Sequence, residues 1–201
     1  MSPFTIIFFG PPGSGKGTQV KLLERFLKEH DPDRRQVSVS TGEHFRAIVN
    51  KETYSSKLMR ATLERGDLQP EFIAIWLWSG IFIEELKGDE HIITDGFPRM
   101  PLEGKVFDTA LTFYQRESPH ILHLKLTEEQ AIQRLNLRQT KEGRADDQSS
   151  ARGLRFKLYN EKTLPTIEVL RENPRYHYHE VNGERTVEEI HHDILKILSL
   201  S

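Results

Sequence analysis

The chain has 201 residues, enough for one domain with a sizeable core. Its 28 Lys and Arg against 30 Asp and Glu give a formal net charge of -2, so no global field attracts nucleic acid or an anionic membrane. The absence of cysteine excludes disulfides, thiolate zinc sites and a cysteine nucleophile. The longest apolar run, residues 4–9, is too short to span a bilayer, and residues 1–3 lack the basic start of a signal peptide. We therefore expect a cytoplasmic protein without nucleic-acid or membrane partners.

Short apolar runs alternate with helical stretches along the chain. The expected strands are residues 4–9, 37–40, 92–94, 121–126 and 177–181. The expected helices are residues 15–28, 41–50, 70–86, 102–114, 128–138, 148–173 and 187–198. Strands that alternate with helices indicate a parallel sheet with helices on both faces. Ligands of such sheets bind beyond the carboxyl ends of the strands.

Two stretches fit this alternation poorly. Residues 41–70 add polar helical pieces between the second strand and the next long helix. Residues 139–150 are polar and have no periodic pattern, which is typical either of a surface loop or of a moving lid. The arginines on both sides of residues 139–150 favour the lid.

A glycine-rich segment follows the first expected strand. The spacing Gly10…Gly15-Lys16 matches the phosphate-binding loop pattern, and a helix is expected directly after it. Glycines allow backbone N–H groups to face an anion at the helix N-terminus, while the lysine reaches the terminal phosphates. We expect the nucleotide phosphates to contact this loop at Gly13, Ser14, Gly15, Lys16, Gly17 and Thr18.

One position departs from the general pattern of phosphate loops. Gly17 follows the lysine, where a Ser or Thr usually ligates magnesium, and the hydroxyl comes one residue later at Thr18. Magnesium bound with ATP would then be held mainly by phosphates and water. Asp95, just past the expected strand 92–94, is our candidate for orienting those waters, the alternative being a solvated turn aspartate.

Several further motifs, taken in order, resemble those of the adenylate kinase family over nearly the whole chain. These segments are Gly15-Lys16-Gly17-Thr18, Ser40-Thr41-Gly42-Glu43-His44-Phe45-Arg46, Gly66-Asp67-Leu68-Gln69-Pro70, Asp95-Gly96-Phe97-Pro98-Arg99, Arg134 with Arg138, Gly143-Arg144-Ala145-Asp146-Asp147, Arg155, and Tyr159-x-x-x-Thr163-x-Pro165. The resemblance implies one P-loop domain over residues 1–201, a three-layer sandwich with a five-stranded parallel sheet. Within it, residues 41–70 would be a monophosphate-binding insert and residues 139–150 a short lid.

The resemblance also implies a role for each charged residue. Lys16, Arg138, Arg144 and Arg155 would surround the donor phosphates and the group in transfer, with Arg99 on the acceptor side. Arg134 would stack on the donor adenine, and Asp146 and Asp147 would form bonds across the cleft when the lid closes. The acceptor nucleotide would be held by Thr41, Arg46, Asp67, Leu68, Gln69, Gly96, Arg99 and Glu103.

Glu103 disagrees with the family pattern, because relatives that accept AMP usually carry glutamine there. An ionised glutamate accepts from adenine N6 but sets a carboxylate against the N1 lone pair, whereas guanine offers donors at N1 and N2. Thr41, in contrast, fits the adenine-selecting form. Glu103 can point to solvent, be protonated or water-bridged and still read AMP, or select another acceptor.

The expected activity is that of a nucleoside monophosphate kinase, which converts ATP and AMP reversibly into two ADP. The alternatives are the same reaction with GMP or a pyrimidine monophosphate, and a nucleotide-binding sensor without turnover. The sensor ranks last because the lysine and the transfer arginines are all present. We expect a monomer. Trp76 and Trp78 lie in an apolar helix, and we expect both in the core.

Overall fold

The structure, a computed structural model, describes residues 2–142 and 149–200, without the side chains of residues 141, 142, 149 and 150. Five strands form one parallel sheet in the order β2-β3-β1-β4-β5. They are β1 (Thr5–Phe9), β2 (Gln36–Ser40), β3 (His91–Asp95), β4 (His120–Lys125) and β5 (His177–Asn182). The five-stranded parallel sheet expected from the sequence is confirmed, and β1 occupies its centre.

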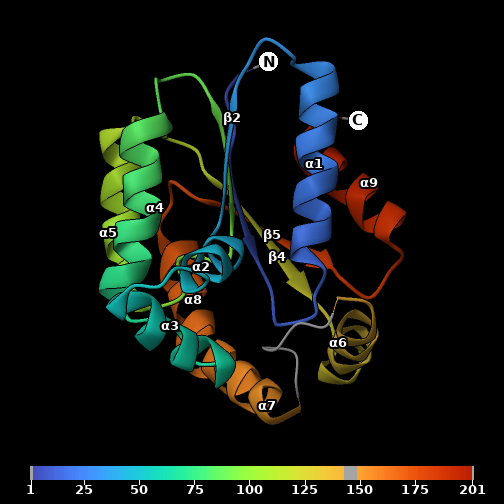
Figure 1. Ribbon diagram of the computed structural model, residues 1–201. Coiled ribbons are helices and arrows are strands. Elements are labelled where there is room, and N and C mark those ends of the chain that lie inside the picture. The colour runs from blue at the N-terminus through green and yellow to red at the C-terminus, as the bar shows by residue number, and fades with distance from the viewer. Residues whose placement is uncertain (1, 143–148, 201) are drawn as a thin grey trace.

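Helices cover both faces of this sheet, which makes three layers (Figure 1). The helical segments are α1 (Lys16–His30), α2 (Thr41–Val49), α3 (Tyr54–Glu64), α4 (Glu71–Glu85), α5 (Pro101–Phe113), α6 (Glu128–Glu142), α7 (Ser149–Leu158), the π-helical turn η2 (Tyr159–Thr163), α8 (Leu164–Glu172) and α9 (Val187–Ile197). Side chains of α1 and α9 pack on one face of the sheet. Those of α4, α5 and α8 pack on the other.

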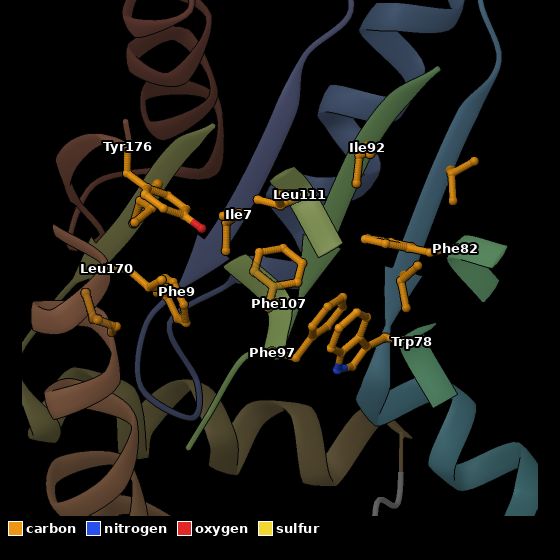
Figure 2. Packing of buried hydrophobic residues seen from close by; sticks show 14 residues of the cluster. Ile7, Phe9, Trp78, Phe82, Ile92, Phe97, Phe107, Leu111, Leu170 and Tyr176 are labelled. Atoms are coloured by element: carbon orange, nitrogen blue, oxygen red, sulfur yellow. The ribbon is translucent and has the colours of Figure 1, made fainter. Parts of the chain in front are cut away.

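The larger core lies between the sheet and α4, α5 and α8. Figure 2 shows the aromatic side chains at its centre, where Trp78 stacks on Phe97 with ring centroids 5.7 Å apart and Phe107 meets both rings edge-on. Trp78 is fully buried, but Trp76 is 62% exposed, so the expectation that both lie in the core is wrong for Trp76. The helix α4 is apolar around its whole circumference, so its sequence pattern does not reveal which face is buried.

The stretch from residue 148 to 173, expected as one helix, is divided. The N–H of Leu164 donates to the carbonyl of Tyr159, five residues back, and the π-helical turn η2 separates α7 from α8. Pro165 follows at once and has no N–H to offer to the carbonyl four residues before it. The wider turn therefore lies where a regular α-helix would leave a carbonyl unpaired.

Two small cores lie beyond the sheet. Residues of α2 and α3 pack against α4 around Phe45 and Met59, and Phe156 of α7 packs on α6. The segment after α3 reaches α7, because a Cβ at Gly66 would lie 2.7 Å from the carbonyl oxygen of Ala151. In Figure 1, α2, α3, α6 and α7 surround the end of the molecule at which α1 begins. The carboxyl edge of the sheet is thus enclosed by helices on several sides.

Histidines from the neighbouring strands β4 and β5 meet on one face of the sheet, near its amino edge. His120 is the register partner of His177, and its Nδ1 lies 3.2 Å from Nε2 of His179. Burial, together with the adjacent imidazoles of His179 and His177, lowers the pKa of His120 to about 4. On the same strand, burial lowers the pKa of His123 to about 4. Both rings are therefore neutral in the folded protein at pH 7.

We expect the protein to lose stability as the pH falls from about 6.5 towards 4. Unfolded histidine takes up a proton near pH 6.5, whereas folded His120 and His123 do so only near pH 4, so the unfolded state binds more protons in this window. Each such histidine lowers the free energy of unfolding by up to about 1.4 kcal/mol per pH unit. Urea unfolding at pH 7.5, 6.5 and 5.5 measures the slope, and His120→Gln should lessen it. The same slope in His120→Gln and in the wild-type protein would contradict the expectation.

Candidate active site

The glycine-rich loop turns from β1 into α1 at the centre of the sheet. Gly15 is the N-cap of α1 in the left-handed conformation, with φ of 89°. Lys16 folds back over the loop, and its Nζ donates to the carbonyl of Gly10 at 2.7 Å, to that of Pro11 at 3.2 Å and to Ser14 Oγ at 3.2 Å. The lysine ammonium and the first N–H groups of the helix therefore face the same space, as an anion site requires.

Burial of the ammonium group lowers the pKa of Lys16 to about 8. The carboxylate of Asp95 opposes this shift, while Arg99, Arg155 and Arg138 add to it. Cations from three separate elements thus act on one ammonium group. Several positive charges at one place, partly withdrawn from water, make a site that is stabilised by a bound polyanion.

A cavity opens beside the loop, and every residue expected to hold the acceptor lines it. These residues are Thr41, Arg46, Asp67, Leu68, Gln69, Gly96, Arg99 and Glu103, and Lys16 and Arg155 line it as well. They come from α1, α2, the segment before α4, the end of β3, α5 and α7. Segments far apart in the sequence therefore converge on one space at the carboxyl edge of the sheet.

Two of the acceptor-side residues are held by a single carbonyl. Thr41 Oγ1 donates to the Gly96 oxygen at 2.8 Å, and Arg99 Nε donates to the same oxygen at 2.5 Å. A Cβ at Gly96 would lie 2.7 Å from Arg99 Nη2, so the guanidinium lies flat against the turn. The first residue of α2 and the arginine before α5 are therefore fixed relative to each other.

Glu103 is buried, with 2% of its surface exposed, which excludes the reading in which it points to solvent. Its Oε2 accepts from the backbone N–H of Arg99 at 2.6 Å, as a carboxylate in the first turn of a helix commonly does. Its Oε1 has no hydrogen-bond partner in the described part of the chain. Burial raises the pKa of Glu103 to about 7, although the Arg99 N–H and guanidinium oppose the rise. One carboxyl oxygen therefore remains for a ligand.

Of the residues expected on the donor side, Lys16 and Arg155 line the cavity, and most of the others belong to the glycine-rich loop or to α6 beside it. Arg134 of α6 donates to the carbonyls of Ser14 and Arg185, each at 3.4 Å. Arg138, one turn further along α6, is close enough to affect the pKa of Lys16. The residues expected on this side that do not line the cavity are Gly13, Ser14, Gly15, Gly17, Thr18, Arg134 and Arg138.

Asp95 ends β3 and faces the start of α1. A Cβ at Gly17 would lie 3.6 Å from Asp95 Oδ2, so the position that carries a hydroxyl in most phosphate loops here lies in contact distance of a carboxylate and bears no side chain of its own. A carboxylate at a phosphate site suits a hydrated magnesium ion, which keeps several of its waters. The residues present therefore fit magnesium held through water.

Three expected site residues, Arg144, Asp146 and Asp147, lie outside the described residues, as do residues 143–148 of the expected lid. The structure also brings into the cavity residues that the sequence did not single out. Tyr159 and Thr163 of η2 line it, as do Phe45 and Met100. Tyr159 and Thr163 belong to the motif Tyr159-x-x-x-Thr163-x-Pro165, to which no role was assigned from the sequence.

Comparison with known proteins places these features in a family. The family model described as adenylate kinase matches residues 8–174. The adenylate kinase of Flavobacterium psychrophilum is 33% identical over 187 residues, which cover 92% of this chain and 93% of the relative. The adenylate kinase of Leptospira biflexa is 32% identical over 191 residues, which cover 95% of this chain and 97% of the relative. The adenylate kinase of Bacteroides fragilis is 31% identical over 192 residues, which cover 95% of this chain and 96% of the relative. In the described ranges, no helix has the length and apolar character needed to cross a membrane. The chain belongs to the adenylate kinase family and is a phosphotransferase.

Proposed function

We propose that the cavity transfers a phosphoryl group reversibly from ATP to AMP, giving two ADP. One observation supports the proposal: the same cavity is lined by Lys16, Arg99 and Arg155 and by the residues expected to hold the acceptor. Relatives at 30–33% identity are named adenylate kinases, which favours AMP over GMP or a pyrimidine monophosphate.

In this mechanism the protein positions two nucleotides and neutralises charge. Phosphoryl transfer needs little covalent chemistry from the enzyme, because the transition state spreads negative charge over phosphate oxygens. Arg46 and Arg99 would hold the acceptor phosphate, with Arg99 braced by the Gly96 carbonyl. Lys16, Arg138 and Arg155 would face the donor phosphates, and Arg134 the donor base. Such charge-assisted contacts contribute most where they tighten in the transition state.

Part of the phosphate charge would be neutralised by magnesium when it is bound with ATP. Asp95, which lies beside Gly17, would hold that ion through water.

We also propose that residues 41–70 and 139–150 move to enclose the nucleotides. The first segment supports this because α2 and α3 form a small core of their own against α4, separate from the cores on the sheet. The second comprises the last residues of α6, residues 143–148 and the first residues of α7, and it precedes the buried Phe156 of α7. Closure excludes water that would otherwise hydrolyse ATP.

A coupled assay of the purified protein tests the activity. Rates with ATP and each of AMP, GMP, CMP and UMP should show AMP as the best acceptor. A strong preference for GMP would overturn the choice of acceptor. ATP binding without transfer to any monophosphate would favour a sensor.

Replacing Glu103 by glutamine should remove a pH dependence of acceptor binding. Oε2 is occupied by the Arg99 N–H, and Oε1 is buried without a partner among the described residues, so Oε1 would be the atom to meet adenine N1 once the acceptor is bound, and only the protonated form donates to it. Because the pKa of Glu103 is about 7, the protonated fraction falls above pH 7, and KM for AMP should rise by up to about tenfold per pH unit. The AMP phosphate, with a pKa near 6, is fully ionised in this range.

The measurement is KM for AMP from pH 7 to 8.5 in the wild-type enzyme and in Glu103→Gln. In the variant KM should be lower at pH 8 and nearly constant over the range. KM for ATP serves as the internal control, because Glu103 lies on the acceptor side. An unchanged slope in Glu103→Gln would show that another group causes the pH dependence.

A further inference from the structure

A buried histidine that the proposed mechanism does not use lies beneath the cavity. His123 of β4 is 1% exposed, and each of its ring nitrogens meets a phenol hydroxyl. Nε2 lies 2.6 Å from Tyr159 Oη, and Nδ1 lies 2.8 Å from Tyr178 Oη. A neutral imidazole has one N–H donor and one acceptor nitrogen, so two hydroxyls satisfy it completely.

The two tyrosines come from different parts of the fold. Tyr178 is on β5, the strand next to β4, and does not line the cavity. Tyr159 is the first residue of η2, directly after α7, and does line it. Arg155 lies four residues before Tyr159 and lines the same cavity. Residues four apart share one face of a helix, so the two side chains project to the same side.

The helix α7 has other attachments, and they lead to α6. Phe156 packs on Ala131 and Leu135, and Arg152 donates to the side-chain oxygens of Asn136 and Gln139. The hydrogen bond from Tyr159 to His123 instead joins the end of α7 to the sheet. His123 is the register partner of Phe9, the residue immediately before the glycine-rich loop.

We propose that His123 is a positioning residue for phosphoryl transfer, holding Tyr159 and thereby setting where Arg155 stands relative to the phosphate loop. The inference rests on the proposed function for the role of Arg155. It assigns a task to the π-helical turn as well, because Tyr159, the first residue of η2, is the residue that meets His123 of β4. A guanidinium displaced by about 1 Å can lower a transfer rate by as much as a hundredfold.

Tyr159→Phe tests the proposal, because it removes the hydroxyl and keeps the ring. The rate constant of transfer from ATP to AMP in a single-turnover experiment should fall about tenfold, with KM for either nucleotide changed less than about twofold. Tyr176→Phe is the matched control. Tyr176 is 5% exposed, donates to Asp108 Oδ1 at 2.8 Å, and precedes β5 at the opposite edge of the sheet from the cavity. Both variants should lower Tm, but Tyr176→Phe should leave the rate unchanged.

A double-mutant cycle with Arg155→Lys separates positioning from a general loss of rigidity. If Tyr159 acts through Arg155, Tyr159→Phe should slow the wild-type enzyme about tenfold and the Arg155→Lys enzyme hardly at all. Equal slowing in both backgrounds, or an unchanged rate in Tyr159→Phe, would overturn the inference. A wild-type enzyme without transfer to any monophosphate would instead overturn the proposed function, so the two failures are distinguishable.

Discussion

Replacing Lys16 by methionine is expected to lower the rate of phosphoryl transfer about a thousandfold, in the range found for removal of a cation or donor that meets transition-state charge. The lysine Nζ already lies against the Gly10 carbonyl at 2.7 Å, so its charge is in place before a nucleotide binds. Its pKa of about 8 reflects burial among cations, and a bound phosphate relieves that cost. Methionine keeps much of the side-chain volume and removes the charge.

The coupled assay at saturating ATP and AMP measures this loss. Lys28→Met is the control, because Lys28 is exposed in the last turn of the same helix, and its rate should equal that of the wild-type enzyme. If the rate of Lys16→Met fell by less than about tenfold, the arginines alone would stabilise the negative charge of the transition state.

The substitution Gly13→Ala is expected to raise KM for ATP about a hundredfold, because the loop backbone has no room to accept a methyl group. A Cβ at this position would lie 2.5 Å from the carbonyl oxygen of Ala131 and 3.0 Å from Leu135 Cγ. Both residues are fully buried in α6, so that helix does not yield easily. The φ of Gly13 is also +83°, which an alanine rarely adopts. The loop must therefore shift, and its N–H groups then miss the phosphates.

Isothermal titration with ATP and the steady-state KM both report this change. Gly153→Ala is the matched control, since a Cβ there meets nothing within 4 Å and the residue lies within α7, where alanine favours the helix. It should bind ATP as the wild-type protein does and melt at an equal or slightly higher temperature. Similar affinities in Gly13→Ala and Gly153→Ala would contradict the steric argument.

The strands were predictable to within about two residues because each is a short apolar run between polar segments. The same cue could not tell the two tryptophans of α4 apart, since an apolar helix has no polar face to mark its orientation. The division of residues 148–173 was missed as well, although Pro165 was a signal for it in the sequence. The contact of Tyr159 with His123 at the start of η2 is tertiary and has no local signal.

The residues expected to hold an acceptor occur in recognisable segments of the sequence, and the fold brings all of them to one cavity. The state of Glu103 was not predictable, since a glutamate is usually exposed and burial here depends on the turn before α5. The third histidine beside His177 and His179 was equally hidden. His120 lies beside them because β4 and β5 are neighbours in the sheet. The order of strands in a sheet cannot be predicted from a short stretch of sequence.

The contrast between Trp76 and Trp78 gives the enzyme two optical reporters with different access to solvent. Trp76 is 62% exposed, so a water-soluble quencher such as iodide can collide with it, whereas Trp78 is shielded. Trp78 stacks on Phe97, which lies in the sequence between Gly96 and Arg99, two residues that line the cavity. The emission that persists under quencher therefore comes from an indole one side chain removed from the segment that lines the cavity, and a change in that emission on adding AMP would report binding there in the unlabelled protein.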